Sequence, residues 1–261
     1  MAVHRLGGTV VVMEKYDPEE ALAAIEKYKI TDSQWVPTHF VRMLKLPEEA
    51  RAKYDVSSLK CAVHAAAPCP VPVKEAMIAW WGPVLREYYA GTEGNGFTFI
   101  TSEEWLEHKG SVGRALNAII HICGEDGEEV PVGDEGVVYF ESESQFSYHN
   151  DPVKTAESRH PKHPNWSMLG DVGKVDAEGF LYLTDRKSFM IISGGVNIYP
   201  QEIENLLVHH PKVADAAVIG APDEDMGERV VAIVQPLDWA NAGEELADEL
   251  KAYLRQSVSG V

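Results

Sequence analysis

Residues 167–204 read SMLGDVGKVDAEGFLYLTDRKSFMIISGGVNIYPQEIE, and this stretch decides how the chain is organised. An extended segment leads into a turn at 176–179, where Asp and Gly favour a tight reversal, and a second strand is expected at 180–184. A charged joint at 185–188 follows, and then a short apolar run that ends in two glycines. A helix is expected from Pro200, because proline is favoured in the first turn of a helix. One sheet therefore ends here and a new folding unit begins.

The chain upstream of this stretch alternates between strand and helix signals. Runs of β-branched and apolar residues predict short strands, and apolar positions that recur at helical spacing predict the helices between them. The predicted strands are 9–13, 59–64 and 85–89, with a short extended piece at 32–37. The predicted helices are one that begins at Asp17 and Pro18, a segment around 40–44, and 71–81. The run at 9–13 is continuous, which is typical of a strand covered on both faces. Such a βαβα order predicts a mostly parallel sheet.

The pattern changes after residue 111. Strands punctuated by Asp-Gly turns predict a small antiparallel β section. Two helices and two strands after residue 188 predict a small α+β unit, which the chain's end would truncate. The predicted fold class is therefore α/β, in three parts: a mostly parallel α/β part at 1–111, a β-rich part at 112–187, and a small C-terminal domain at 188–261.

The bulk composition limits the kinds of partner. The formal charge of −18 argues against non-specific binding to nucleic acid or to anionic membranes. No apolar run approaches the ~18 residues of a membrane span. Three cysteines at positions without paired metal spacing are typical of reduced thiols, and no signal peptide is visible, so we expect a cytoplasmic protein.

A glycine-rich loop, Tyr89-Ala-Gly-Thr-Glu-Gly-Asn-Gly96, follows the predicted strand 85–89 directly. Ligands of open α/β sheets bind at the carboxyl ends of strands, and glycines let backbone amides turn toward a bound anion. Thr92 offers a hydroxyl, and Glu93 offers hard oxygens that suit Mg²⁺. The alternative is a tight turn with ordinary polar residues, and the spacing alone leaves both interpretations open.

A pair of histidines, His160 and His163, stands in a polar loop flanked by prolines. Two histidines so close together could suggest a metal site, but their polar, proline-flanked loop favours exposure to solvent. We expect solvated surface here.

Three motifs, in order and at consistent spacing, carry a resemblance to a known family. They are Tyr89-Ala-Gly-Thr92-Glu93, then Gly170-Asp171 with Leu169 where Thr is usual, and then Asp185-Arg186 followed by the nearly continuous run 191–204. Together they resemble the acyl-CoA synthetase branch of the adenylate-forming enzymes, also called AMP-dependent synthetases and ligases. The resemblance extends over essentially the whole chain.

The resemblance implies an acid–thiol ligase that uses Mg²⁺ and ATP to convert a carboxylic acid into an acyl-adenylate, and then transfers the acyl group to coenzyme A. It implies that Tyr89 packs on adenine, Thr92 contacts phosphate and Glu93 helps to hold Mg²⁺. Asp171 would accept hydrogen bonds from the ribose hydroxyls, for which a carboxylate is suited. Arg186 would donate to ribose or phosphate.

The resemblance also implies roles around the second half-reaction. Ser188 falls at the hinge of the small domain, where Asp or Lys is more usual. Gly194 and Gly195 would line the pantetheine tunnel, where a backbone without side chains allows close approach. The acid is expected to be fatty or otherwise apolar, and its pocket is expected to include His64, Ala66 and Trp35.

Two family motifs are absent from the sequence, namely the Ser/Thr/Gly-rich phosphate loop and the catalytic Lys. We therefore expect an internal fragment that is inactive or weak by itself, since losing one charge-stabilising group can cost ~10²–10³ in rate. Two alternatives stay open. The chain is a non-catalytic nucleotide- or acyl-binding remnant, or it belongs to an adenylating domain that loads a carrier protein.

Overall fold

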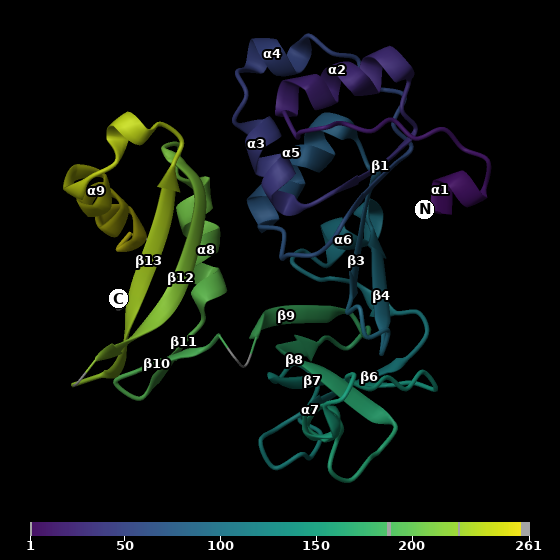
Figure 1. Ribbon diagram of the computed structural model, residues 1–261, viewed down its shortest axis with the longest axis vertical. Helices are drawn as coiled ribbons and strands as arrows, with labels where there is room; N and C mark the ends of the chain where they lie inside the picture. Colours follow the sequence, from purple (N-terminus) through teal and green to yellow (C-terminus); the bar gives the residue numbers. More distant parts are fainter. Residues whose placement is uncertain (1, 187–188, 224, 257–261) are drawn as a thin grey trace. The chain divides into compact units, whose positions relative to one another are not determined.

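The computed structural model describes residues 2–186, 189–223 and 225–256. The chain divides into two compact units (Figure 1). Unit 1 contains Met1–Glu87 and Thr101–Leu106, and unit 2 contains Tyr88–Ile100 and Glu107–Val261. The mixture of helices and sheets confirms the predicted α/β class.

Unit 1 is built from short strands and from helices that pack on one another (Figure 1). Strand β2 pairs in parallel with β1 on one side and with the first half of β3 on the other, which confirms the parallel arrangement predicted from the βαβα order. The elements are α1 (Ala2–Arg5), α2 (Pro18–Tyr28), β1 (Asp32–Trp35), α3 (Pro37–Leu44), α4 (Glu48–Ala52), β2 (Cys61–His64), α5 (Val71–Trp81), β3 (Leu85–Ala90) and α6 (Ser102–Glu107).

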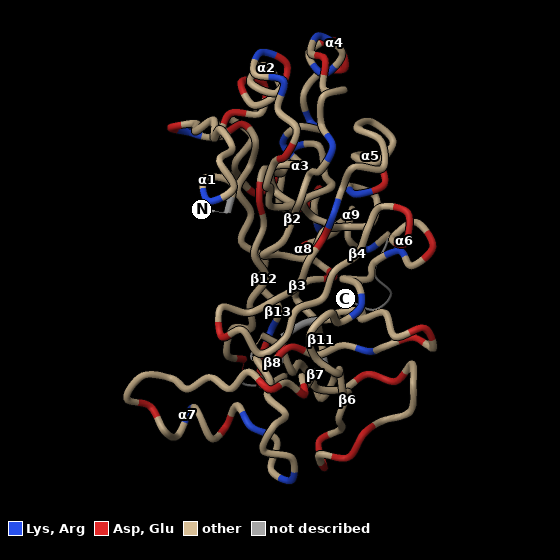
Figure 2. Tube along the Cα trace, turned by 90° about the vertical axis from the view of Figure 1, so that its right-hand side faces the viewer, with Lys and Arg blue, Asp and Glu red and all other residues tan. Residues whose placement is uncertain are grey.

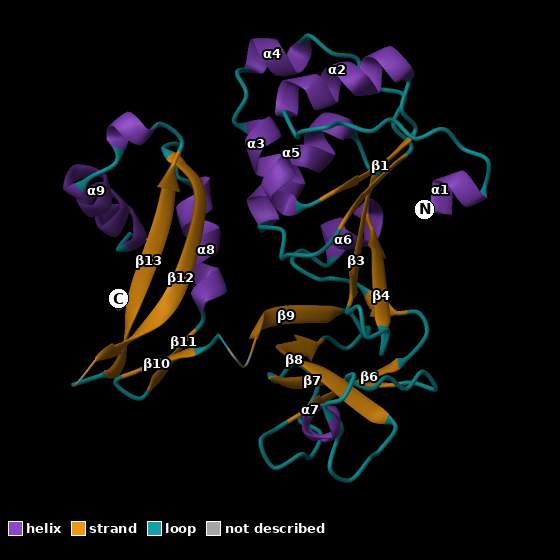
Figure 3. Cartoon of the chain, in the orientation of Figure 1, coloured by secondary structure: helices purple, strands orange, loops and turns teal. Residues whose placement is uncertain are grey.

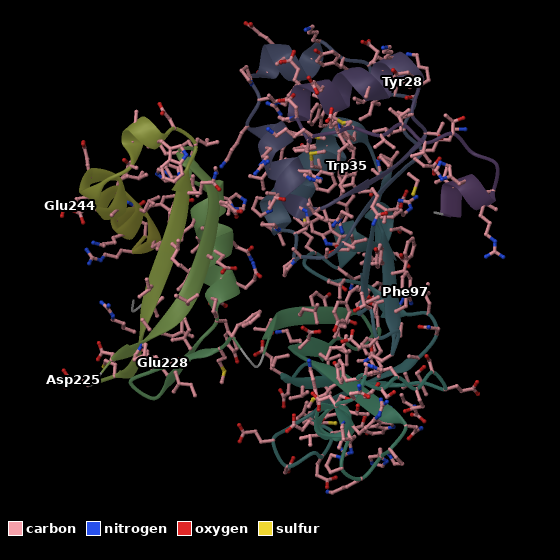
Figure 4. All side chains as sticks on the ribbon, in the orientation of Figure 1. Tyr28, Trp35, Phe97, Asp225, Glu228 and Glu244 are labelled. Atoms are coloured by element: carbon pink, nitrogen blue, oxygen red, sulfur yellow. The ribbon has the colours of Figure 1, made fainter. Side chains whose placement is uncertain are left out.

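Local capping explains where α2 begins. The Asp17 carboxylate accepts hydrogen bonds from the backbone N–H groups of Glu19 and Glu20, and Pro18 occupies the first turn. Ala21, Leu22 and Ile25 form the buried face of the helix. Tyr28, the last residue of the helix, is 52% exposed (Figure 4).

The predicted strand at 9–13 is wrong. These residues have no regular secondary structure, and Val10 and Val12 are exposed. A β-branched run favours extended backbone, but a strand also needs a neighbouring strand to hydrogen-bond its backbone. Within the described part of the chain, no strand pairs with this segment.

Unit 2 starts with the second half of β3 and continues with strands β4 (Phe97–Thr101) and β5 (Arg114–Ala115), which pair antiparallel. A separate four-stranded antiparallel sheet follows in the order β6-β7-β8-β9, as predicted for the β-rich part (Figure 3). Its elements are β6 (Ile119–Cys123), β7 (Gly136–Glu141), α7 (Pro152–Glu157), β8 (Trp166–Val175) and β9 (Leu181–Arg186). Its core contains Val138, Phe140 and Leu181, with Tyr89 packed against it.

The C-terminal part of unit 2 has its own sheet, in the order β11-β10-β13-β12, and its own core. Side chains of the two helices and of the strands meet in that core, including Ile203 and Leu207 of α8 and Leu246 and Leu250 of α9. The elements are β10 (Ile191–Ser193), β11 (Val196–Ile198), α8 (Pro200–His209), β12 (Val213–Asp223), β13 (Gly227–Pro236), the 3₁₀ helix η1 (Trp239–Asn241) and α9 (Glu244–Leu254). The predicted α+β composition is therefore present.

Candidate functional site

The first two motifs meet in unit 2 through a side-chain hydrogen bond. The Tyr89 hydroxyl, at the end of β3, donates to Oδ2 of Asp171 in β8, which lies 82 residues further along the chain. Asp171 is 5% exposed, and the Tyr89 ring lies 6.0 Å from that of Phe140. A carboxylate has about four acceptor positions, so this bond uses only part of the capacity of Asp171. Two residues that the sequence places far apart thus belong to one site.

The loop after β3 carries the two predicted phosphate-side residues. Thr92 is exposed, and its hydroxyl lies 3.3 Å from Glu93 Oε2, to which it donates. The two side chains therefore present adjacent hard oxygens. Mg²⁺ is usually held by one or two carboxylates together with substrate phosphates, and this donor set fits such a role. Among the described residues, no group of three or more acidic, His or Cys side chains forms a complete metal cage.

Leu169 stands where the motif usually has Thr, and its side chain lies close to Gly91. A Cβ atom placed on Gly91 would lie 2.2 Å from Leu169 Cδ1, closer than two such atoms can approach. A side chain at position 91 would therefore force the Leu169 side chain to shift. This contact joins the first motif to the second.

The third motif is brought to the second by strand register. Arg186 of β9 is the register partner of Asp171 in β8, and Asp185 is the partner of Val172. The backbone thus places Arg186 opposite Asp171. The predicted hinge residue Ser188 lies outside the described residues.

Gly194 and Gly195 form the two-residue turn between β10 and β11. Their φ angles are +56° and +80°, the positive pair that a type I′ hairpin turn requires. The Gly194 N–H donates to the Met226 carbonyl at 2.8 Å. The hairpin itself therefore explains both glycines, whatever ligand they meet.

The predicted acyl-pocket residues lie in unit 1. Trp35 and His64 are register partners at the ends of β1 and β2, and both rings pack against Phe40. Trp35 lies within the crowded side chains of this unit (Figure 4). Ala66 is exposed in the following loop, with a φ of +77° that L-residues rarely adopt.

His64 belongs to a buried polar cluster that also contains Lys74 and Glu87. Its Nε2 lies 3.7 Å from Glu87 Oε2, and Lys74 Nζ lies 2.5 Å from the same oxygen. All three residues are less than 5% exposed. Burial, and then the Lys74 cation, hold the pKa of His64 well below its ordinary value. His64 is therefore a neutral core residue.

The His64 environment predicts a pH-dependent loss of stability. A base with a depressed pKa in the folded state takes up its proton first in the unfolded state, so stability is complete above pH ~6.5 and falls below it. The stability difference between the wild type and His64→Asn should change by about 1.4 kcal/mol between pH 7.5 and 5.5, the wild type losing more. Urea unfolding at each pH measures this. The exposed His4 gives the matched control: His4→Asn should follow the wild type, and an unchanged difference for His64→Asn would contradict the prediction.

Two residues of the site carry no sequence signal. Asn95 is 1% exposed, and its Nδ2 donates to the Ser167 carbonyl of β8 at 3.2 Å. The Tyr148 hydroxyl donates to Glu93 Oε1 at 3.0 Å. Both bonds span more than 50 residues, so only the fold brings the partners together. They fix the glycine-rich loop against the rest of unit 2.

The expectation of solvated surface at His160 is wrong. His160 is 2% exposed, and its Nε2 lies 2.8 Å from the Gly127 carbonyl. Its Nδ1 accepts from the backbone N–H groups of Lys162 and His163, so Nε2 carries the proton and donates to Gly127. His160 thus stabilises its loop through these hydrogen bonds, whereas His163 is exposed.

Acidic residues outnumber basic residues in this chain. Figure 2 shows Lys and Arg spread along the trace among the more numerous Asp and Glu. In the described ranges, the structure has no helix with the length and apolarity of a membrane span.

Two family models and several known proteins match this chain. A family model described as AMP-binding enzyme matches residues 1–148, and a second, AMP-binding enzyme C-terminal domain, matches residues 202–261. A medium/long-chain-fatty-acid–CoA ligase, FadD8, of Mycobacterium tuberculosis is 32% identical over 97% of this chain and 44% of its own length. A feruloyl-CoA synthase of an Amycolatopsis species is 33% identical over 97% of this chain and 50% of its own. The chain spans about half the length of the relatives it matches.

Solved structures agree with this assignment. The amide bond synthetase McbA of Marinactinospora thermotolerans has a TM-score of 0.78 and 33% identity, over 97% of this chain and 51% of its own. The o-succinylbenzoate CoA synthetase MenE of Bacillus subtilis, in complex with its acyl-adenylate intermediate, has a TM-score of 0.77 and 29% identity, over 97% and 50%. Because the first family model covers more than half of the 261 residues, this chain belongs to the AMP-binding enzyme family.

Proposed function

We propose that this chain forms the nucleotide-binding part of an ATP-dependent ligase that activates a carboxylic acid as its acyl-adenylate and transfers the acyl group to coenzyme A. The hydrogen bond between Tyr89 and Asp171 carries the proposal, because it joins the adenine-side residue of one motif to the ribose-side carboxylate of the next. The names of its relatives, a fatty-acid–CoA ligase and a feruloyl-CoA synthase, support an acid–thiol ligation.

The residues divide the binding task by chemistry. The Tyr89 ring packs on the adenine face, and the Asp171 carboxylate accepts hydrogen bonds from the ribose hydroxyls. Arg186 donates to ribose or phosphate from the strand position opposite Asp171. Thr92 contacts phosphate, and Glu93 is the carboxylate that holds Mg²⁺, which neutralises phosphate charge when bound. The reacting carboxylate is itself the nucleophile, so the protein's contribution is positioning and charge stabilisation.

The second half-reaction is assigned to the C-terminal part of the chain. The turn at Gly194 and Gly195 faces the pantetheine arm of coenzyme A, and Ser188 lies in the hinge. The acyl substrate is an apolar acid, with Trp35, His64 and Ala66 near its pocket. In this proposal the chain divides into the three predicted parts, 1–111, 112–187 and 188–261. Three free cysteines, Cys61, Cys69 and Cys123, favour a reducing cytoplasm.

Binding of an acyl-adenylate mimic tests the proposal directly. Acyl-sulfamoyl adenosines keep the adenosine and the acyl chain but cannot react, so isothermal titration calorimetry reports affinity without turnover. The purified chain should bind one equivalent of a fatty-acyl or aryl-acyl mimic in a saturable manner, and more tightly than AMP, since the acyl chain adds buried apolar surface. A folded chain that binds neither AMP nor any mimic at millimolar concentration would overturn the proposal.

A further inference from the structure

Tyr148 contacts the carboxylate that we assign to Mg²⁺. Its hydroxyl donates to Glu93 Oε1 at 3.0 Å, while Glu93 Oε2 accepts from the Thr92 hydroxyl at 3.3 Å. Each oxygen of the carboxylate therefore has a donor, so the plane of the group is fixed. A carboxylate oxygen has two acceptor positions, and the bond from the phenol occupies only one of them. The Glu93 carboxylate is thus oriented by these bonds and keeps an acceptor position for a cation.

The backbone of Tyr148 is anchored to α7. Its N–H donates to the Thr155 hydroxyl at 2.9 Å, and that hydroxyl donates in turn to the Asp151 carbonyl at 2.8 Å. Asp151 caps the helix by accepting from the Lys154 N–H. The segment that carries Tyr148 is consequently tied to the first turn of α7.

The ring of Tyr148 is held as well. Lys154 Nζ lies 4.4 Å from the ring centroid, and the Phe146 ring meets it edge-on at 5.4 Å. Phe146 is itself fixed by Arg159, whose guanidinium carbon lies 4.5 Å from the ring centroid and which donates to the Phe146 carbonyl. These contacts give the phenol a defined position rather than that of a mobile surface tyrosine.

We propose that Tyr148, which none of the family motifs quoted above includes, is a positioning residue that holds the Glu93 carboxylate in the orientation needed for Mg·ATP. The proposal rests on the proposed function, in which Glu93 holds Mg²⁺. It assigns the segment between β7 and α7 a part in nucleotide binding, and it does so through one hydroxyl group.

The test compares nucleotide affinity with and without the metal. Tyr148→Phe removes only the hydroxyl, and calorimetry should show about 10-fold weaker binding of a non-hydrolysable ATP analogue with Mg²⁺, the effect of losing one hydrogen bond to a charged group. Binding of AMP without Mg²⁺ should be unchanged. Tyr182→Phe is the matched control, because the Tyr182 hydroxyl also donates to a carboxylate at 3.0 Å, that of Asp176, which belongs to no motif. It should leave both affinities unchanged.

A second comparison separates the two proposals. Glu93→Gln should remove most of the Mg²⁺-dependent gain in affinity, and adding Tyr148→Phe to it should cause little further loss. If Glu93→Gln has no effect, or if the unmodified chain binds no nucleotide, the proposed function fails and the Tyr148 role fails with it. If Glu93→Gln acts as expected but Tyr148→Phe equals the wild type, only the Tyr148 proposal is overturned.

A spectroscopic measurement does not depend on nucleotide binding. With 3-fluorotyrosine placed at position 148, the ¹⁹F resonance should move when Glu93 is changed to Gln, because the phenol then loses a charged acceptor. The same label at position 182 should not respond to Glu93→Gln. Equal or absent responses at both positions would show that Tyr148 and Glu93 are not in contact, and would overturn the proposal.

Discussion

Replacing Lys74 by Met should lower the free energy of unfolding by about 3–5 kcal/mol. Lys74 is 1% exposed, and its Nζ lies 2.5 Å from Oε2 of Glu87, which is 4% exposed. Burial raises the pKa of Glu87 and lowers that of Lys74, and their mutual attraction offsets part of both shifts. Without the cation, Glu87 is either a buried unpaired charge or a carboxyl forced to bind a proton. Urea unfolding followed by tryptophan fluorescence measures the loss, and Trp105, 4.7 Å from Lys74 Nζ, lies beside the change.

Two controls separate the buried charge from the loss of packing. Lys74→Met combined with Glu87→Leu should recover most of the stability, because replacing a whole buried ion pair by apolar residues is often neutral. Lys29→Met is the matched surface control, since Lys29 and Asp55 form a pair at 3.2 Å with side chains at least half exposed. That change should stay within about 0.5 kcal/mol. A double variant as unstable as Lys74→Met alone would contradict this explanation.

Asp171→Asn should weaken the binding of AMP by ~10–100-fold, the effect of losing one hydrogen bond to a charged acceptor. The substitution keeps the size of the side chain but replaces one acceptor oxygen by a donor and removes the charge. The Tyr89 hydroxyl, which donates to this carboxylate, then has a neutral partner. Calorimetry with AMP measures the change, and circular dichroism checks that the variant is folded.

The ligand itself supplies the sharpest control for Asp171. An AMP analogue without the 2′ and 3′ hydroxyl groups should bind the wild type and Asp171→Asn with equal affinity, because the contact that distinguishes them is gone. If the variant weakens both ligands equally, Asp171 acts by shaping the site and not by holding the ribose. If AMP affinity does not change at all, the ribose assignment is wrong.

Local signals in the sequence predicted much of the fold. Helix α5 begins and ends at the predicted residues, and Asp17 with Pro18 marked the start of α2 because capping depends on neighbours within one turn. The segment 9–13 failed because strand formation depends on a distant partner. The length of strand β12 also depends on a partner, because its antiparallel pairing with β13 continues to Asp223. Helix ends are thus set by near neighbours, whereas strands are set by long-range pairing.

The candidate site was predictable to the extent that it is made of motifs. Tyr89, Asp171 and Arg186 are named by their motifs, and the register of β8 and β9 brings the last two together. Tyr148 and Asn95 were not predictable, because their hydrogen-bond partners lie 55 and 72 residues away in the sequence. The local sequence around a Tyr or an Asn in a polar loop does not reveal such a distant partner. His160 was mistaken for the same reason, since its hydrogen bond to Gly127 exists only in the fold.

The contact between Gly91 and Leu169 constrains how this sequence can diverge. The Leu169 side chain occupies the space that any side chain at position 91 would need, so the two positions share one volume. A larger residue at 91 therefore requires either a shifted Leu169 side chain or a smaller residue at 169. Substitutions at 91 should accordingly be tolerated better when 169 carries Thr, which lacks the Cδ1 atom that fills this space.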